Sequence, residues 1–202
     1  DIFELQDSVS NAVASEIEPS ITASEVRRAA TQPTRSNSAY DLYLRGTRAY
    51  WELWTKDSLT RAEALFEQAA TLDPDFALAQ AYASSALINC VLQGHADDPL
   101  PMMQRSAEYA RAALRAGSHD AEVLSLAAYT LFQCEEPQPA IDEMIERAMA
   151  INPGMSRCHY TAGFINLYAC RGEAALAAYD MALRLDPRTP WRDAIMIGRA
   201  QA

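Results

Sequence analysis

AEALFEQAATLDP (62–74) is the first of four stretches of the chain that share one pattern. The other three are SAEYARAALRAGS (106–118), IDEMIERAMAINP (141–153) and AALAAYDMALRLDP (174–187). Their last residues lie 44, 35 and 34 positions apart, and five positions before each last residue stands an alanine, at Ala69, Ala113, Ala148 and Ala182. Self-similarity at such a period is typical of stacked helical units and not of a single globular core.

The spacing within each stretch predicts a helix with one packed face. Positions twelve, eight and five before the last residue fall on the same side of a helix, because residues three and four apart are neighbours there. In the first stretch these positions hold Ala62, Phe66 and Ala69. Asp-Pro or Asn-Pro then ends three of the four stretches, and proline cannot continue the helical hydrogen-bond ladder.

A second apolar segment follows each of the first three stretches, so the chain predicts helical hairpins. These segments are FALAQAYASSALINCVL (76–92), AEVLSLAAYTLFQC (121–134) and MSRCHYTAGFINLYAC (155–170). Small residues recur in the middle of each, where two helices must approach closely, at positions 83–84, 127–128 and 162–163. Gly94 and Gly172 predict turns between the paired helices.

This pattern resembles that of tetratricopeptide repeat proteins. The small, aromatic, alanine and proline positions of that family's second helix match at 62–74 and 174–187, isoleucine takes two of them at 141–153, and Ser118 replaces the proline at 106–118. The family's first helix matches SAYDLYLRGTRAYWELW (38–54), with Gly46 as its small packing residue. The resemblance implies an all-α fold, a right-handed superhelical solenoid of about four helical hairpins with extra N-terminal and C-terminal helices.

The same pattern divides the chain. Residues 1–30 are expected to form an N-terminal helical segment, which begins with an amphipathic helix over 2–17, and residues 31–37 a linker. The repeats are expected over 38–189, as units 38–74, 75–118, 119–153 and 154–187. A C-terminal capping helix is expected over 190–202, where Trp191, Ile195 and Ile197 would cover the last apolar face.

Charge and composition narrow the classes of partner. The net charge is −10, which opposes binding of this segment to nucleic acid or to an anionic membrane surface. No apolar run reaches the roughly 18–20 residues that a membrane span needs, and the acidic start does not resemble a signal peptide. The four cysteines stand apart on apolar segments, which favours a reducing compartment. We therefore expect a cytoplasmic protein.

The sequence predicts no catalytic, cofactor-binding or metal-binding site. His95 lies close to Asp97 and Asp98, but in a loop whose simpler interpretation is a solvated turn. The Cys158-His159 pair is twelve residues from Cys170 on one apolar segment, so these side chains would not converge. No glycine-rich phosphate loop and no nucleophile elbow occurs. We expect neither enzyme activity nor a cofactor within these residues.

In tetratricopeptide arrays the first helix of each hairpin lines a concave groove, so the resemblance implies a protein-binding groove here. Aligned by helical phase, its residues are Tyr40, Tyr43, Tyr50 and Trp51 in the first unit, Ser85, Ile88 and Asn89 in the second, Tyr129, Phe132 and Gln133 in the third, and Arg157, Tyr160 and Phe164 in the fourth. Such an aromatic, weakly charged groove would prefer an apolar or aromatic helix, or a segment of the same polypeptide. The alternative is that half of these side chains only pack against neighbouring helices.

DIFELQDSVSNAVASEIEPSI (1–21), followed by AYDLYLRG (39–46), carries a second resemblance. It is similar to the segment that joins an upstream domain to C-terminal repeats in bacterial class III adenylate or guanylate cyclases and in CadC-like winged-helix regulators. The resemblance implies a non-catalytic protein–protein interaction scaffold, the C-terminal regulatory region of a cyclase-like signalling protein. Two alternatives stay open: the sensory or effector region of a winged-helix transcriptional regulator, and a homo-oligomerisation module that forms a homodimer.

Overall fold

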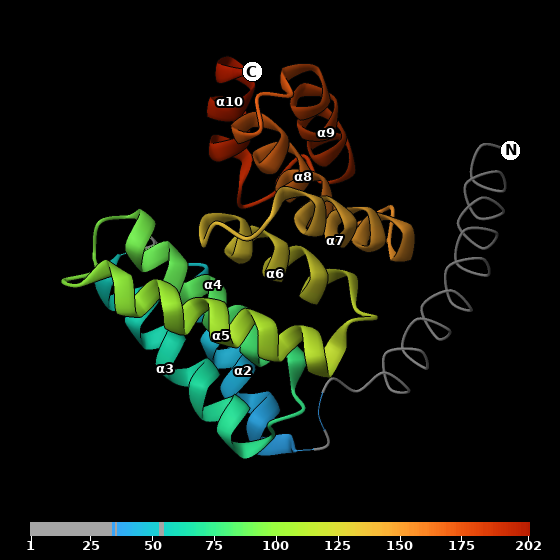
Figure 1. Ribbon diagram of the computed structural model, residues 1–202. Helices are drawn as coiled ribbons and strands as arrows, with labels where there is room; N and C mark the ends of the chain where they lie inside the picture. The colour runs from blue at the N-terminus through green and yellow to red at the C-terminus, as the bar shows by residue number, and fades with distance from the viewer. Residues whose placement is uncertain (1–33, 35, 53–54) are drawn as a thin grey trace, which may run out of the picture. The chain divides into compact units, whose positions relative to one another are not determined.

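The computed structural model describes residue 34, residues 36–52 and residues 55–202 (Figure 1). Its helices are α2 (Asn37–Tyr50), α3 (Lys56–Leu72), α4 (Ala77–Leu92), α5 (Pro99–Gly117), α6 (Ala121–Gln133), α7 (Gln138–Ile151), α8 (Ser156–Tyr168), α9 (Gly172–Leu185) and α10 (Arg192–Gln201). These ranges contain no strand, so the prediction of an all-α fold is confirmed for them. The helix expected over 2–17 lies outside the described residues.

The helices pack as four consecutive hairpins. The pairs are α2 with α3, α4 with α5, α6 with α7, and α8 with α9. We call α2, α4, α6 and α8 the first helices and α3, α5, α7 and α9 the second helices. First helices also pack on one another, α4 on α6 and α6 on α8, and α10 packs on α8 and α9. Helices thus contact near neighbours along the chain, as the predicted tetratricopeptide-like solenoid requires.

Local sequence signals set the ends of the helices where they were expected. The second helices α3, α7 and α9 end at Leu72, Ile151 and Leu185, one residue before an Asp-Pro or Asn-Pro pair. At the start of α6, the carboxylate of Asp120 accepts hydrogen bonds from the amides of Glu122 and Val123. Such a side chain satisfies amides that have no partner within the helix.

The repeated positions of the second helices form the core. Those twelve, eight and five places before the end of each stretch are all buried: Ala62, Phe66 and Ala69 in α3, Ser106, Ala110 and Ala113 in α5, Ile141, Ile145 and Ala148 in α7, and Ala175, Tyr179 and Ala182 in α9. The predicted packed face of each second helix is therefore confirmed. Burial of this apolar area supplies the main driving force for stacking the hairpins.

Two glycines of the first helices leave room for aromatic rings of the second helices. A Cβ atom added to Gly46 would lie 2.7 Å from the ring of Phe66, and one added to Gly163 would lie 2.4 Å from the ring of Tyr179. Any larger residue would have to displace a buried ring. This close approach explains the small residue that the sequence analysis assigned to Gly46.

The turn inside each of the last three hairpins has one residue with positive φ. These residues are Gly94, Glu135 and Cys170. Gly94 was predicted as a turn residue, whereas Gly172, predicted likewise, is instead the first residue of α9. Cys170 takes the turn position of that hairpin because the amide of Arg171 closes the end of α8 with a hydrogen bond to the carbonyl of Asn166.

The helix α10 packs on the last hairpin, against both α8 and α9. Ile195 and Trp191 at its start are buried, as expected for a cap, whereas Ile197 is 60% exposed. A Cβ atom on Gly198 would lie 2.6 Å from the hydroxyl oxygen of Tyr179, so α10 lies directly against that ring. Tyr179 is thus enclosed between Gly163 of α8 and Gly198 of α10.

Candidate binding surface

The structure separates the predicted groove residues into two groups. Tyr50, Ser85, Ile88, Asn89, Tyr129, Arg157 and Tyr160 are buried. Tyr40, Tyr43, Trp51, Phe132, Gln133 and Phe164 are half-buried, so part of each remains accessible. The alternative in which half of these side chains pack between helices therefore describes the first group.

The buried group contains a chain of hydrogen bonds across three first helices. The hydroxyl groups of Tyr50 in α2 and Ser85 in α4 lie 2.8 Å apart. The Asn89 amide donates to the Tyr50 hydroxyl over 2.9 Å and accepts from the Tyr129 hydroxyl of α6 over 3.2 Å. Burial raises the pKa of both tyrosines, which stay neutral. These polar groups satisfy one another, which buried polar groups require, and so offer no free atoms to a partner.

Arg157 is the second buried feature of this face. Its guanidinium carbon lies 4.3 Å from the ring centroid of Trp191, 5.4 Å from that of Trp51 and 5.5 Å from that of Tyr82. Its Nε lies 3.5 Å from Oε1 of Glu122. Burial by itself disfavours the charged form, but Tyr82 and Glu122 outweigh it, so the pKa of Arg157 is raised. The side chain stays charged between aromatic rings and one carboxylate.

The accessible part of the first helices forms an aromatic edge near the ends of α6 and α8. The ring centroids of Phe132 and Phe164 lie 6.1 Å apart, and those of Phe164 and Tyr168 lie 4.7 Å apart. Tyr168 is 61% exposed, although it is one of the largest apolar side chains of the chain. Tyr168 is not among the residues predicted from the sequence, although its position four residues after Phe164 places it on the same helical face.

A pocket of about 190 Å³ opens beside this edge, between α8, α9 and α10. Its lining is entirely uncharged and consists of Tyr160, Phe164, Leu167, Tyr168, Tyr179, Ala194, Ile197, Gly198 and Gln201. Ile197 at its rim is as exposed as Tyr168. We call Phe132, Phe164, Tyr168, Ile197 and this pocket the aromatic edge. It combines a concave apolar surface with exposed rings, which is the usual form of a recognition site.

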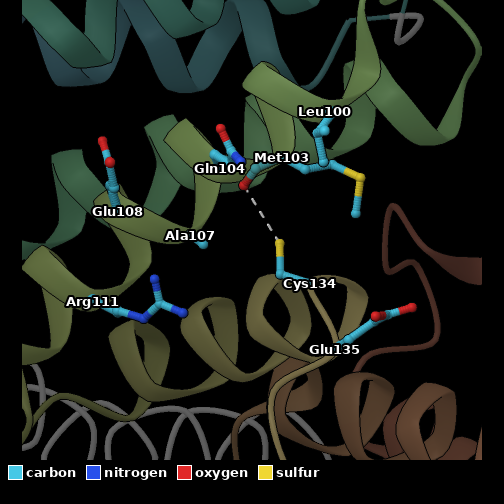
Figure 2. A pocket seen from close by; sticks show the side chains of 8 residues that line it. All are labelled: Leu100, Met103, Gln104, Ala107, Glu108, Arg111, Cys134 and Glu135. Carbon is cyan, nitrogen blue, oxygen red and sulfur yellow. Dashed lines mark hydrogen bonds between the residues drawn. The ribbon is translucent and has the colours of Figure 1, made fainter.

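Figure 2 shows a second, more polar pocket of about 370 Å³, between α5 and the turn that follows α6. Leu100, Met103 and Ala107 supply apolar walls, while Glu108 and Arg111 lie along one side. The thiol of Cys134 donates to the carbonyl of Met103 over 3.6 Å, and burial raises the pKa of this thiol. A raised pKa favours the protonated thiol, which is a weaker nucleophile than the thiolate.

The weaker chemical candidates of the sequence lie in the turn between α4 and α5 and along α8. Asp97 faces Lys56 at 3.2 Å, in the same turn as His95. Cys158 is buried at the start of α8 and Cys170 is exposed beyond its end. Within residues 36–52 and 55–202, no group of three His, Cys, Asp or Glu side chains is arranged to hold a metal ion. None of the helices described there is long and apolar enough to cross a membrane.

Comparisons with known proteins add little beyond the fold. A scan against protein-family models and a search of curated proteins found no match. Among solved structures, the chain is similar to MamA (14% identity over 72% of this chain and 87% of that one, TM-score 0.46). It is also similar to TTC0263, a thermophilic TPR protein of Thermus thermophilus (16% identity, 79% and 98%, TM-score 0.47). A third is YrrB, a TPR protein with an unusual peptide-binding site (17% identity, 87% and 79%, TM-score 0.48). At these identities and scores, the likenesses say nothing about what this chain binds.

Proposed function

We propose that this chain is a non-catalytic scaffold that binds a protein or peptide partner at its aromatic edge. The observation that carries the proposal is the exposure of Tyr168 and Ile197 around an uncharged pocket. Large apolar side chains are normally buried, and their exposure around a pocket marks a contact surface. Aromatic rings also lose little conformational entropy when they bind, so they dominate the energetics of many interfaces.

The pocket defines the chemistry of the partner. Every residue that lines it is uncharged, so a charged side chain would lose its hydration there and gain no opposite charge. Its volume of about 190 Å³ suits one large aliphatic or aromatic side chain. We infer a partner segment that inserts one such side chain into the pocket and lays a neighbouring apolar residue against Phe132 and Phe164.

Selection of peptides from a random display library tests this proposal without knowledge of the natural partner. We expect the enriched peptides to share one large apolar residue without an adjacent charge. Tyr168→Ala should weaken their binding about tenfold, and Ile197→Asp should weaken it more, because it places a charge at the rim of the pocket. Fluorescence anisotropy of labelled peptides gives the dissociation constants.

Leu44→Ala is the matched control, since Leu44 is an exposed apolar residue on α2 outside the aromatic edge. Its variant should bind the selected peptides like the parent, and circular dichroism should show equal helicity for all three variants. Equal binding by the Tyr168→Ala variant and the parent would contradict the proposal, as would a library that yields no peptide above background.

We further propose that this scaffold regulates or localises a catalytic domain that precedes it in a bacterial, cytoplasmic signalling protein similar to class III nucleotide cyclases. The support is the resemblance of residues 1–21 and 39–46 to the joining segment of such proteins. The gene sequence upstream of this region distinguishes the alternatives. Metal-binding aspartates of a cyclase would support the proposal, whereas a basic recognition helix would favour a winged-helix transcriptional regulator.

Self-association is the other candidate, which the apolar stripe of residues 2–17 in the sequence favours. Light scattering over a wide range of concentration tests it. A constant monomer mass would exclude a homodimer, whereas a dimer that is lost when residues 1–30 are removed would place the contact in that segment.

A further inference from the structure

Six side chains from five parts of the fold form one cluster, with the guanidinium of Arg157 at its centre. Trp51 follows α2, Tyr82 belongs to α4, Glu122 to α6, Arg157 and Tyr160 to α8, and Trp191 precedes α10. The rings of Trp51 and Trp191 lie 5.3 Å apart, and that of Tyr160 stacks on Trp191 at 5.3 Å. We call these six residues the Arg157 cluster. We propose that it is an intramolecular clasp, which holds the end of α2 against the start of α10 and closes the inner face of the hairpin stack.

The first support is that side chains alone carry this contact. Among the described helices, α2 packs on α3 and α4, and α10 packs on α8 and α9, so the two have no direct helix packing. Trp51 and Trp191 are nonetheless in contact although they lie 140 positions apart in the chain. Trp51 is the side chain that joins the two regions, because it packs against the buried cluster that contains Tyr82 and against the one that contains Trp191.

The second support is the electrostatic arrangement. Arg157 is only 7% exposed. The Tyr82 hydroxyl donates to Oε1 of Glu122 over 2.5 Å and accepts from the Arg157 guanidinium over 3.3 Å. The cation, the phenol and the carboxylate therefore compensate one another. Loss of Glu122 would leave the buried Arg157 guanidinium without a carboxylate partner, which is unfavourable.

The third support is what the clasp covers. Tyr50 contacts both Trp51 and Tyr82 edge to face, and it begins the buried hydrogen-bond chain with Ser85 and Asn89. Opening of the clasp would uncover this polar and aromatic face of the first helices. This inner face is distinct from the aromatic edge, although Tyr160 belongs to the Arg157 cluster and also lines the pocket of the edge.

Hydrogen exchange read by mass spectrometry tests the clasp across the stack. Trp191→Ala should speed exchange at residues 47–52 at least tenfold, although these residues are distant in sequence and belong to the first hairpin. Met196→Ala is the matched control, since Met196 is an exposed residue of α10, the helix that Trp191 precedes. It should leave exchange at 47–52 unchanged. Faster exchange confined to α8–α10 in the Trp191→Ala variant would overturn the proposal, because Trp191 would then be a local cap only.

The reciprocal variant keeps the test decisive if Trp191→Ala fails to fold. Trp51→Ala should speed exchange at residues 189–195 by a similar factor, because coupling between two sites is mutual. Arg157→Ala should speed exchange at both 47–52 and 189–195. Added methylguanidinium should slow exchange there again, because it can occupy the space left between the rings. Unchanged exchange at 189–195 in a folded Trp51→Ala variant would overturn the clasp. The clasp would also be overturned if methylguanidinium slowed exchange in the Arg157→Ala variant no more than the same concentration of methylammonium.

Discussion

Three single residues set the turns within the last three hairpins. Gly94, Glu135 and Cys170 have φ values of 71°, 62° and 58°. After each of them, the next amide donates back to a carbonyl of the preceding helix: His95 to Cys90, Glu136 to Leu131 and Arg171 to Asn166. This is the Schellman closure of a helix end, in which glycine is favoured because it has no Cβ atom. Glu135 and Cys170 therefore hold a backbone conformation that disfavours their own side chains.

Glycine at those two turns should stabilise the protein. We expect Glu135→Gly and Cys170→Gly each to raise the free energy of unfolding by about 0.5–1 kcal/mol, and Gly94→Ala to lower it by about 1 kcal/mol. No atom lies within 4 Å of a Cβ placed on Gly94, so the lower free energy of unfolding of Gly94→Ala would come from backbone strain and not from a steric clash. Urea unfolding followed by circular dichroism gives the values. An unchanged midpoint for Gly94→Ala would contradict this account of the turns.

A second residue-scale prediction concerns space and not backbone conformation. Gly163→Ala would place a Cβ atom 2.4 Å from the Tyr179 ring, so we expect a loss of about 1–3 kcal/mol from overpacking. Gly154→Ala is the control, because the nearest atom to its added Cβ, Oδ1 of Asn152, lies at an ordinary 3.6 Å. Thermal unfolding should separate the two variants clearly. Similar melting temperatures for both would mean that α8 and α9 move apart without cost.

At the scale of the helices, charged pairs join successive second helices across the hairpins. Arg105 of α5 reaches Glu67 of α3 at 2.7 Å, and Arg171 at the start of α9 donates two hydrogen bonds to Asp142 of α7, at 2.8 and 2.7 Å. These bonds hold the pKa values of Asp142 and Glu67 below their usual range. The two ion pairs join helices that do not pack directly on each other, α3 with α5 and α7 with α9.

The tie between Asp142 and Arg171 should make stability depend on pH. The folded state lowers the pKa of Asp142, so the pair stabilises the fold above the ordinary aspartate pKa and loses this effect as the pH falls through the folded value. Because both side chains are about a third exposed, we expect Arg171→Gln to cost only about 0.2–1 kcal/mol near neutral pH. The difference from the parent should shrink between about pH 5 and about pH 3. Urea unfolding at a series of pH values measures it.

Arg147→Gln controls for the loss of an arginine as such. Arg147 donates to the backbone carbonyl of Ser118 over 3.0 Å, an acceptor that does not titrate in this range. The small loss of unfolding free energy in the Arg147→Gln variant should therefore be the same at both ends of the pH series. If the Arg171→Gln difference also stayed constant with pH, Asp142 would not be the group responsible.

The elements themselves were predictable because their signals are local. The spacing of Ala62, Phe66 and Ala69 fixes a packed helical face, and the proline two residues beyond α3 fixes where that helix ends. The cap of α6 is local in the same sense, because the Asp120 carboxylate accepts from amides two and three residues further along the chain. Cys170 escaped prediction because its left-handed conformation depends on the closure of α8, and not on its residue type.

At the scale of the whole described region, the sequence could not show how the inner face closes. Helical phase correctly places Tyr50, Asn89 and Arg157 on the first helices, but it does not say how near the two ends of the stack approach. That depends on a small rotation between neighbouring hairpins that accumulates along the stack. The contact between Trp51 and Trp191 is the result. About half of the predicted groove residues are buried in the stack.

This burial predicts an uneven distribution of local stability. Residues 79–90 of α4 and 123–131 of α6 are all buried, whereas only Ile195 and Gly198 are buried within α10. Local opening is easiest where few apolar contacts are lost, so a stack of hairpins opens from its ends. We expect amides of α4 and α6 to exchange at least about tenfold more slowly than those of α10 after Ile195. Nuclear magnetic resonance of the parent chain under native conditions measures the rates. Uniform protection from α4 to α10 would contradict this gradient and would mean that residues 36–202 unfold as one unit, with contacts between hairpins too strong for any end to open alone.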